Sequence, residues 1–183
     1  MEFTSSLETK DLIIAKAKPS DLEKIFENYW CSKKTATYML WKPQRNLDEA
    51  KERLERTINF QKDHLAFFVY EKYSGEPIGQ VAFIEVEDGT FEDGGIGIGE
   101  NFVGKGYGKQ ILTCFINYLF QEVGANKIVC SCHTDNMPSA KMQLACGMKY
   151  SYSKMVTREK DGLTYKSDNY VITRDEWIEN NKN

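Results

Sequence analysis

The stretch Gly99-Glu100-Asn101-Phe102-Val103-Gly104-Lys105-Gly106-Tyr107-Gly108-Lys109 is the part of this chain that decides its fold. It follows an apolar run with Ile96 and Ile98 and precedes a repeat of apolar residues typical of an amphipathic helix. Glycine allows the backbone to turn sharply and a ligand to approach it closely. A helix that begins in such a loop directs unpaired N–H groups and the positive end of its dipole toward the loop. The stretch therefore predicts a binding site for phosphate groups.

Three known phosphate-binding patterns can be compared with this loop. The dinucleotide fingerprint G-x-G-x-x-G matches Gly104 and Gly106, but Lys109 stands at its third glycine. The nucleoside-triphosphate loop G-x-x-x-x-G-K-[ST] matches the glycines and the lysine of Gly99–Gly106. Its final hydroxyl, which holds Mg²⁺, is replaced by Gly106, so a nucleotide-binding protein with a degenerate P-loop is the weaker alternative. The pattern G-x-G-x-G/A at the start of a helix fits without exception.

Val103–Gly108 resembles the R/Q-x-x-G-x-G/A signature of the GNAT superfamily, whose members are acyl-CoA-dependent N-acetyltransferases. Val103 stands where that signature has Arg or Gln. In the family, main-chain N–H groups hold the pyrophosphate of CoA, so the resemblance implies acetyl-CoA as the cosubstrate. The CoA contacts that it implies in the strand and the loop are Ile96, Gly97, Ile98, Val103, Gly104, Lys105, Gly106, Tyr107, Gly108 and Lys109. A glycine-rich turn without a ligand is the alternative for the loop taken alone.

Periodicity and turn residues predict the order β-α-α-β-β-β-α-β-α-β-β. The strands are expected at Asp11–Lys16, Leu65–Lys72, Pro77–Glu85, Phe91–Gly99, Lys127–Cys132, Met148–Thr157 and Thr164–Arg174. Capping boxes at Ser20 and Asn46 open the first two helices, and Gly106–Val123 and Pro138–Cys146 form the later ones. The fold class is α/β (α+β), a mixed seven-stranded sheet flanked by helices, with an antiparallel meander first and then a parallel step across Gly106–Val123. This order is that of the GNAT fold, so we expect residues 1–183 to form a single GNAT domain.

A second motif strengthens the resemblance. Asp135-Asn136-Met137-Pro138-Ser139, followed by Gly147-Met148, is similar to the later motif of the family, which has an Asn, then a small residue and a Gly-aromatic pair. Met148 replaces the usual Phe. The resemblance implies that Asn136 and Ser139 contact CoA. Both residues are also suited to cap a helix, and the two roles are compatible.

Within the superfamily, the chain most resembles the ribosomal-protein-alanine N-acetyltransferase (RimJ/RimL-like) group. Tyr38-Met39-Leu40-Trp41-Lys42-Pro43, followed by Asn46-Leu47-Asp48-Glu49-Ala50, looks like the segment of that group between the first strand and the second helix. The aromatic residues of this segment either line a cleft for the acceptor or pack beneath the second helix. The sequence leaves these two interpretations open.

Acetyl transfer to an amine needs a base for the amine, a donor for the tetrahedral oxyanion and an acid for the CoA thiolate. The resemblance implies a main-chain N–H near Ile96–Ile98 as the oxyanion donor. The Tyr that often serves the family as the acid is replaced by Gln143. The alanine-acetyltransferase group points to Ser139 for this role.

The candidate bases are Glu92 and Asp93, because they begin the strand that leads to the loop, where related enzymes often carry Glu. Strand alternation places Asp93 on one face with Gly95, Gly97 and Gly99. Each carboxylate could equally be a solvated charge at a turn.

Composition limits the other classes of function. The chain has 183 residues, a net charge of −3 and no basic block, which argues against a nucleic-acid partner. No apolar run approaches the ~20 residues of a membrane span, and Met1–Ser6 does not resemble the start of a signal peptide. We therefore expect a cytoplasmic protein without a membrane partner.

The five cysteines are odd in number and irregularly spaced, which argues against a disulfide framework. Cys130-Ser131-Cys132-His133 could suggest a metal site, but on a strand His133 points away from the two thiols. Buried reduced thiols are the better interpretation, and no metal is expected.

Together these features predict an acetyl-CoA-dependent N-acetyltransferase. Its acceptor is a primary amine, either of a small molecule or of a protein N-terminus, which attacks directly in a ternary complex. The replacements Val103 and Gln143 keep open a catalytically silent acyl-CoA-binding module. The sequence also leaves a homodimer open.

Overall fold

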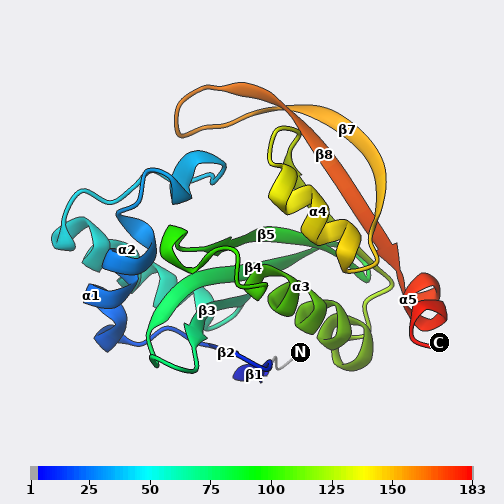
Figure 1. The fold of residues 1–183 in the computed structure, drawn as a ribbon, viewed down its shortest axis with the longest axis horizontal. Helices are drawn as coiled ribbons and strands as arrows, with labels where there is room; N and C mark the ends of the chain where they lie inside the picture. Colours follow the sequence, from blue (N-terminus) through cyan, green and yellow to red (C-terminus); the bar gives the residue numbers. More distant parts are fainter. Residues whose placement is uncertain (1–3, 183) are drawn as a thin grey trace.

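The structure is a computed structural model, and it describes residues 4–182. In this part of the chain, eight strands form one sheet in the order β1-β2-β3-β4-β5-β6-β8-β7 (Figure 1). The strands are β1 (Ser6–Glu8), β2 (Leu12–Ala15), β3 (Leu65–Glu71), β4 (Pro77–Glu87), β5 (Thr90–Ile98), β6 (Lys127–His133), β7 (Lys149–Thr157) and β8 (Thr164–Thr173). The α-helices are α1 (Leu22–Ile25), α2 (Leu47–Gln61), α3 (Tyr107–Tyr118), α4 (Met137–Ala145) and α5 (Arg174–Asn180). Wider π-helical turns continue α1 as Phe26–Trp30 and α3 as Leu119–Val123.

The predicted mixed sheet flanked by helices is confirmed, with one strand more than the seven expected. The additional strand, β1, has three residues and pairs with β2 at the edge of the sheet. A strand this short carries too little alternation to be recognised in the sequence. The last predicted strand ends at Thr173, because the Thr173 and Glu176 side chains form a capping box that opens α5.

The pairing of the strands determines where the sheet opens. β3, β4 and β5 form the predicted antiparallel meander. β5 and β6 are parallel and are joined through α3, as predicted. Their pairing is short, from Thr90–Glu92 on β5 to Lys127–Val129 on β6. Beyond this point the two strands have no paired residues, so the sheet opens in its middle.

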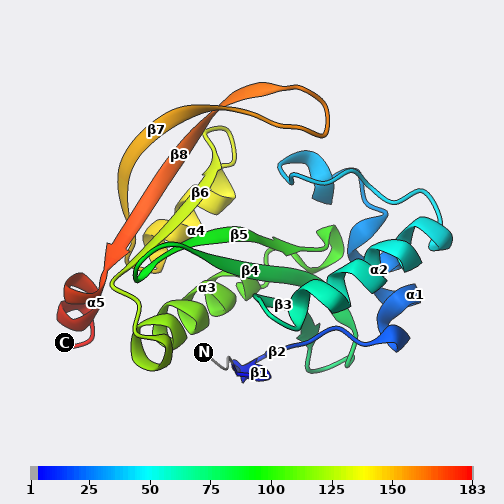
Figure 2. The ribbon, with the colours of Figure 1, turned by 180° about the vertical axis from the view of Figure 1, so that it is seen from behind.

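Helices cover both faces of the sheet. Figure 1 shows α3 in front of the sheet, and Figure 2 shows α2 in front of it from the opposite side. The apolar stripe of α3 is buried against the strands, and the rings of Phe115 and Phe83 stack with their centroids 5.1 Å apart. A separate core under α1 and α2 contains Tyr29, Trp30 and Phe68. None of the helices in residues 4–182 combines the length and the apolar character needed to cross a membrane.

The helix starts were predicted only in part. The first capping box begins at Lys18 rather than Ser20, since the Asp21 carboxylate accepts from the Lys18 N–H at 2.7 Å. Asn46 caps α2 as predicted, and its Oδ1 accepts from the N–H of Glu49 at 3.0 Å.

Candidate active site

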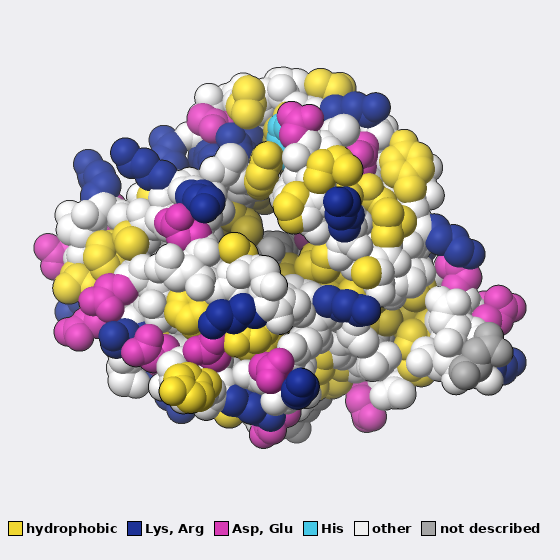
Figure 3. Space-filling view, in the orientation of Figure 1, with side chains coloured by type: hydrophobic (Ala, Val, Ile, Leu, Met, Phe, Trp, Pro, Cys, Tyr) yellow, Lys and Arg dark blue, Asp and Glu magenta, His cyan; other side chains and the backbone are white. Residues whose placement is uncertain are grey.

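A cleft of about 310 Å³ lies where β5 and β6 separate, and we call it the β5–β6 cleft. Its walls come from residues 38–41, from the middle of β5, from the end of β6, from α4 and from the β7–β8 hairpin. Figure 3 shows the hollow in the molecule at this place. Asp93 stands at the fork, and its Oδ1 accepts a hydrogen bond from the main-chain N–H of Ser131 at 2.9 Å. The cleft therefore joins the α3–α4 side of the sheet to the aromatic segment before α2.

A bulge in β5 determines which way Asp93 faces. Asp93 pairs with Phe83, but Ala82, the residue before Phe83 on β4, pairs with Gly95. Gly94 is therefore an extra residue in β5. The bulge reverses the alternation, and Asp93 shares its face with Ile96. The prediction that Asp93 shares a face with Gly95 and the glycines that alternate with it is therefore wrong.

The two candidate carboxylates occupy opposite faces of β5. Glu92 pairs with the exposed Ile84 and does not line the β5–β6 cleft, whereas Asp93 does. Burial and, to a smaller extent, the charge of Glu92 raise the pKa of Asp93 to about 7, against the opposing effect of the hydrogen bond from Ser131. A carboxyl with this pKa is suited to exchange a proton near neutral pH.

The main chain of β5 presents N–H groups to the opening. The N–H of Gly99 donates to the carbonyl of Ile78 on β4 at 2.8 Å. In an antiparallel pair such bonds alternate, so the N–H groups of Ile96 and Ile98 point away from β4 and toward the gap beside β6. The N–H of Gly97 points toward β4, and of the two isoleucines Ile96 lines the cleft.

Gly97 and Gly99 are needed for packing. A Cβ at Gly97 would clash with the hydroxyl of Tyr29, and one at Gly99 would clash with the carbonyl of Asn28. The π-helical turn after α1 therefore lies directly against this part of β5. Packing therefore restricts both positions to glycine.

The loop 103–108 has the backbone that the sequence predicts for a phosphate site. Gly104 and Gly106 have φ angles of 81° and 78°, and Gly106 is the N-cap of α3. A Cβ at either glycine would meet no atom within 4 Å, so the space beside them is open. Gly108 has another role, because its Cβ would lie 2.7 Å from Sδ of Met142 on α4. The loop thus exposes the first N–H groups of a helix longer than three turns.

The side chains beside the loop fasten it to β3. Lys105 Nζ lies 3.0 Å from Oε1 of Glu71, and the Tyr107 hydroxyl donates to the same oxygen at 2.7 Å. The hydrogen bond from Tyr107 is the largest cause of the lowered pKa of this buried carboxyl. Lys105 and Tyr107 therefore hold the loop in place, and the exposed Val103 side chain makes no comparable contact.

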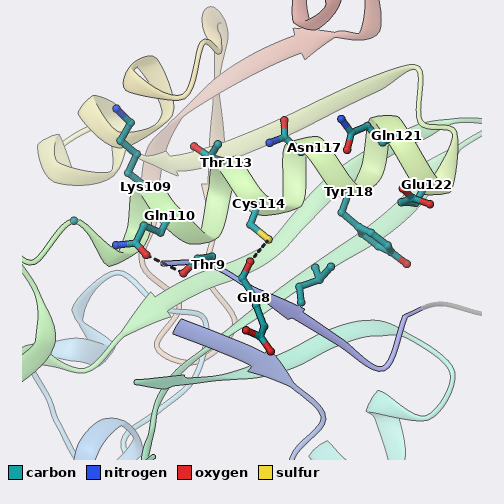
Figure 4. A pocket seen from close by; sticks show the side chains of 12 residues that line it. Glu8, Thr9, Lys109, Gln110, Thr113, Cys114, Asn117, Tyr118, Gln121 and Glu122 are labelled. Carbon is teal, nitrogen blue, oxygen red and sulfur yellow. Dashed lines mark hydrogen bonds between the residues drawn. The ribbon is translucent and has the colours of Figure 1, made fainter. Parts of the chain in front are cut away.

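A larger groove of about 560 Å³ runs between α3 and β1 (Figure 4). Gln110 crosses it, accepting a hydrogen bond from Thr9 at 2.8 Å. Lys109 extends from the first turn of α3 away from β1 (Figure 4). The groove is also lined by Glu8 and Glu122, whose charges disfavour a phosphorylated ligand along its length.

Asn136 and Ser139 both line the β5–β6 cleft at the start of α4. Asn136 Oδ1 accepts from the Ser139 N–H at 3.4 Å, so Asn136 caps the helix. The Ser139 hydroxyl oxygen accepts from Nε2 of Gln143 at 3.1 Å, which leaves the hydroxyl proton free for another acceptor. Gln143 is only 2% exposed, and its Oε1 has no hydrogen-bond partner in residues 4–182.

The aromatic segment before α2 forms part of the wall of the cleft and also packs beneath the helices. Tyr38 and Trp41 line the cleft, and Trp41 also packs edge-on against Tyr29 beneath the helices, with ring centroids 5.2 Å apart. The β7–β8 hairpin holds the segment over the cleft, because Arg158 donates to the carbonyl of Thr37 at 2.7 Å.

Several wall residues were not predicted. Tyr165 stacks on His133 with centroids 4.7 Å apart, and Lys154 lines the cleft on the neighbouring strand. These residues lie in a hairpin whose sequence carries no motif, so only the tertiary fold reveals them.

The cysteines follow the prediction for reduced thiols. Cys130 and Cys132 are free and buried, and burial raises the pKa of both. Both line the β5–β6 cleft. Within residues 4–182 no group of three or more His, Cys, Asp or Glu side chains has the arrangement of a metal site.

Comparison with known proteins agrees with this geometry. A family model described as an acetyltransferase (GNAT) domain matches residues 11–149. Over 141 residues the chain is 26% identical to an uncharacterized N-acetyltransferase, p20, of Bacillus licheniformis, a match that covers 75% of this chain and 78% of the relative.

Two solved structures illustrate the similarity of the fold. An acetyltransferase of the GNAT family from Bacillus anthracis has a TM-score of 0.81 at 18% identity, covering 93% of this chain and 99% of the other. The ribosomal-protein-S5-alanine acetyltransferase of Vibrio fischeri has a TM-score of 0.73 at 20% identity, covering 94% of this chain and 98% of the other. Such identities support the fold alone, whereas the family model spans most of the chain. The chain belongs to the GNAT acetyltransferase family.

Proposed function

We propose that this protein transfers the acetyl group of acetyl-CoA to a primary amine, which attacks the thioester directly in a ternary complex. The observation that carries the proposal is the β5–β6 cleft. It brings Asp93 and Ser139 together from elements far apart in the sequence. It also contains the segment of β5 that leads into the glycine loop.

The main chain supplies the binding groups for acetyl-CoA. The exposed N–H groups at the start of α3 and the open space beside Gly104 and Gly106 suit the pyrophosphate. The N–H groups of Ile96 and Ile98 are placed to stabilise the oxyanion that forms on the thioester oxygen. Asn136, at the N-cap of α4, adds a polar contact at the edge of the cleft.

Two side chains move the protons. Asp93 takes a proton from the ammonium form of the acceptor, which frees the nitrogen lone pair to attack the carbonyl carbon. The C–N bond forms, the nitrogen gives up its second proton to water, the tetrahedral intermediate collapses, and the C–S bond breaks. Ser139 gives its hydroxyl proton to the leaving thiolate and takes one back from water. Its hydrogen bond from Gln143 fixes the oxygen in the orientation that this step needs.

Two classes of amine are candidate acceptors. The resemblance of the segment before α2 to the ribosomal-protein-alanine group favours a protein α-amine, and a small-molecule amine is the second class. A catalytically silent module that only binds acyl-CoA gives the same binding and no transfer. A nucleotide-binding protein would instead prefer Mg²⁺-ATP.

Titration calorimetry with acetyl-CoA and CoA, beside a thermal-shift comparison with Mg²⁺-ATP, tests the ligand. We expect saturable binding of both CoA forms and no stabilisation by Mg²⁺-ATP. The absence of binding at high micromolar acetyl-CoA would contradict the proposal. Binding without turnover on a panel of amines and peptides would favour the silent module.

A further inference from the structure

The guanidinium of Arg53 on α2 lies against two tryptophan side chains. Its guanidinium carbon lies 4.5 Å from the ring centroid of Trp30 and 4.4 Å from that of Trp41, so it contacts both indoles. Its Nη1 is buried and has no hydrogen-bond partner in residues 4–182, and no carboxylate in that part of the chain forms an ion pair with it. Arg56, one turn along, differs in having Glu52 at 3.8 Å.

A cavity of about 280 Å³ lies beside this guanidinium. It is lined by Arg53 and Arg56, and among its described lining residues there is no Asp or Glu. It shares Gln80 and Gly94 with the β5–β6 cleft, and Gly94 directly follows Asp93. The cavity therefore meets the β5–β6 cleft at these two residues, on the side of α2.

An unpaired guanidinium in this position suits an anionic ligand. A buried N–H donor without an acceptor costs free energy, and a buried charge without a partner costs more. Burial lowers the pKa of Arg53 only to about 10, so the side chain stays charged at neutral pH. Contact with the two indoles restrains the guanidinium in advance, and a planar guanidinium matches a carboxylate with two parallel hydrogen bonds.

We propose that Arg53 binds a carboxylate of the acceptor, so that the acceptor is an amine that also carries a carboxylate. This inference rests on the proposed acetyl transfer and specifies its substrate class. The amine would lie at Asp93 and the carboxylate in the cavity beside Arg53. Such a carboxylate belongs either to a free amino acid or to an acidic side chain near the N-terminus of a peptide.

The experiment compares acceptors that differ only in this group. Glycine, β-alanine and longer ω-amino acids are each paired with their carboxamides, and peptides with Glu at the second residue are paired with peptides that have Gln there. We expect kcat/KM to favour the carboxylate in one of these series by about 10- to 100-fold, as for a charge-assisted bidentate hydrogen bond. The series that responds identifies the source of the carboxylate.

Variants of α2 assign the effect to one side chain. Arg53→Gln should bring the ratio between carboxylate and carboxamide close to one, and Arg53→Lys should keep part of it. Lys51→Gln is the matched control, because it removes the same charge from an exposed position on the same helix and should keep the full ratio. Thermal unfolding and acetyl-CoA titration show whether the variants remain folded. If Arg53→Gln does not fold, Arg53→Lys replaces it in the comparison.

The proposal is overturned if the wild-type protein acetylates carboxylate and carboxamide equally, or if the preference survives in Arg53→Gln or is lost instead in Lys154→Gln. Titration of the N-acetylated product and its carboxamide into the CoA-bound protein separates this inference from the proposed function. Binding that needs both the carboxylate and Arg53, without turnover, supports the carboxylate site and counts against acetyl transfer. Turnover without any preference for the carboxylate supports acetyl transfer and counts against the carboxylate site.

Discussion

The Asp93 carboxylate accepts a hydrogen bond from the Ser131 N–H at 2.9 Å, at the position where β5 and β6 stop pairing. This contact links the two strands by a side chain in place of the main-chain ladder. The same half-buried carboxyl has its pKa raised to about 7 by burial. One residue thus marks the fork in the sheet and provides a group that can exchange a proton at neutral pH.

Replacement of this carboxyl should remove the base. We expect Asp93→Asn to keep acetyl-CoA binding and to lower kcat by about 10²-fold or more, because the amine then loses its proton only to water. In the wild type, kcat/KM for the acceptor should rise with pH through about 7, the pKa of Asp93, and the variant should lack this inflection. Initial rates across pH check both statements. An unchanged inflection in Asp93→Asn would assign it to another group.

The raised pKa also predicts how stability depends on pH. In the folded chain Asp93 holds its proton up to about pH 7, whereas in the unfolded chain it loses it near 3.9. The folded state therefore binds more protons between these values, and the contribution of Asp93 to the free energy of unfolding is lost as pH rises from about 4 to 7. Relative to wild type, Asp93→Asn should gain on the order of 4 kcal/mol between pH 4 and pH 8. Urea unfolding at the two pH values measures this gain, and equal differences at both would contradict it.

Gly106 should be needed for CoA binding more than for the fold. Gly106→Val places a Cβ at a φ of 78° and in the open space beside the loop. We expect CoA binding to weaken by about 1–3 kcal/mol, as for one or two lost charge-assisted hydrogen bonds. Gly124→Val is the matched control, because Gly124 has a φ of 86° with equally open space but lies at the far end of the helix. Calorimetry should show normal affinity in the control, and normal affinity in Gly106→Val would mean that the loop does not hold CoA.

Ser139 should affect turnover more than binding. In Ser139→Ala we expect acetyl-CoA affinity close to that of the wild type and a kcat about 10²-fold lower if its hydroxyl is the sole acid for the thiolate. The N-cap of α4 should persist, since Asn136 Oδ1 bonds to the main-chain N–H of residue 139. Steady-state rates beside calorimetry test this split. Unchanged turnover would assign the proton to water and leave Ser139 a structural role.

Features encoded by neighbouring residues were predictable from the sequence. The positive φ angles of Gly104 and Gly106, the helix that follows them and the Asn136 cap each depend on a few consecutive residues. The parallel step followed from two strands joined by one long helix. These features determine the fold and the part of the cleft that is formed by β5, β6 and the start of α4.

Features that depend on tertiary contact were not predictable. The bulge at Gly94 comes from the register between β4 and β5, and it turned Asp93 to the face opposite the one expected. The contact of Arg53 with Trp30 and Trp41 needs three segments that meet only in the folded chain. Arg53 and the walls from the β7–β8 hairpin were missed for this reason, whereas the glycine loop and the start of α4 were not.

Simultaneous measurement of CoA release and of the acetylated amine tests the central claim most directly. The protein is incubated with acetyl-CoA, with and without each amine of the panel, and both products are followed over time. The account predicts one acetylated amine for each CoA released with an accepted amine, and little CoA release without one. CoA release at the same rate with and without every amine, or no acetylated product with any, would contradict it.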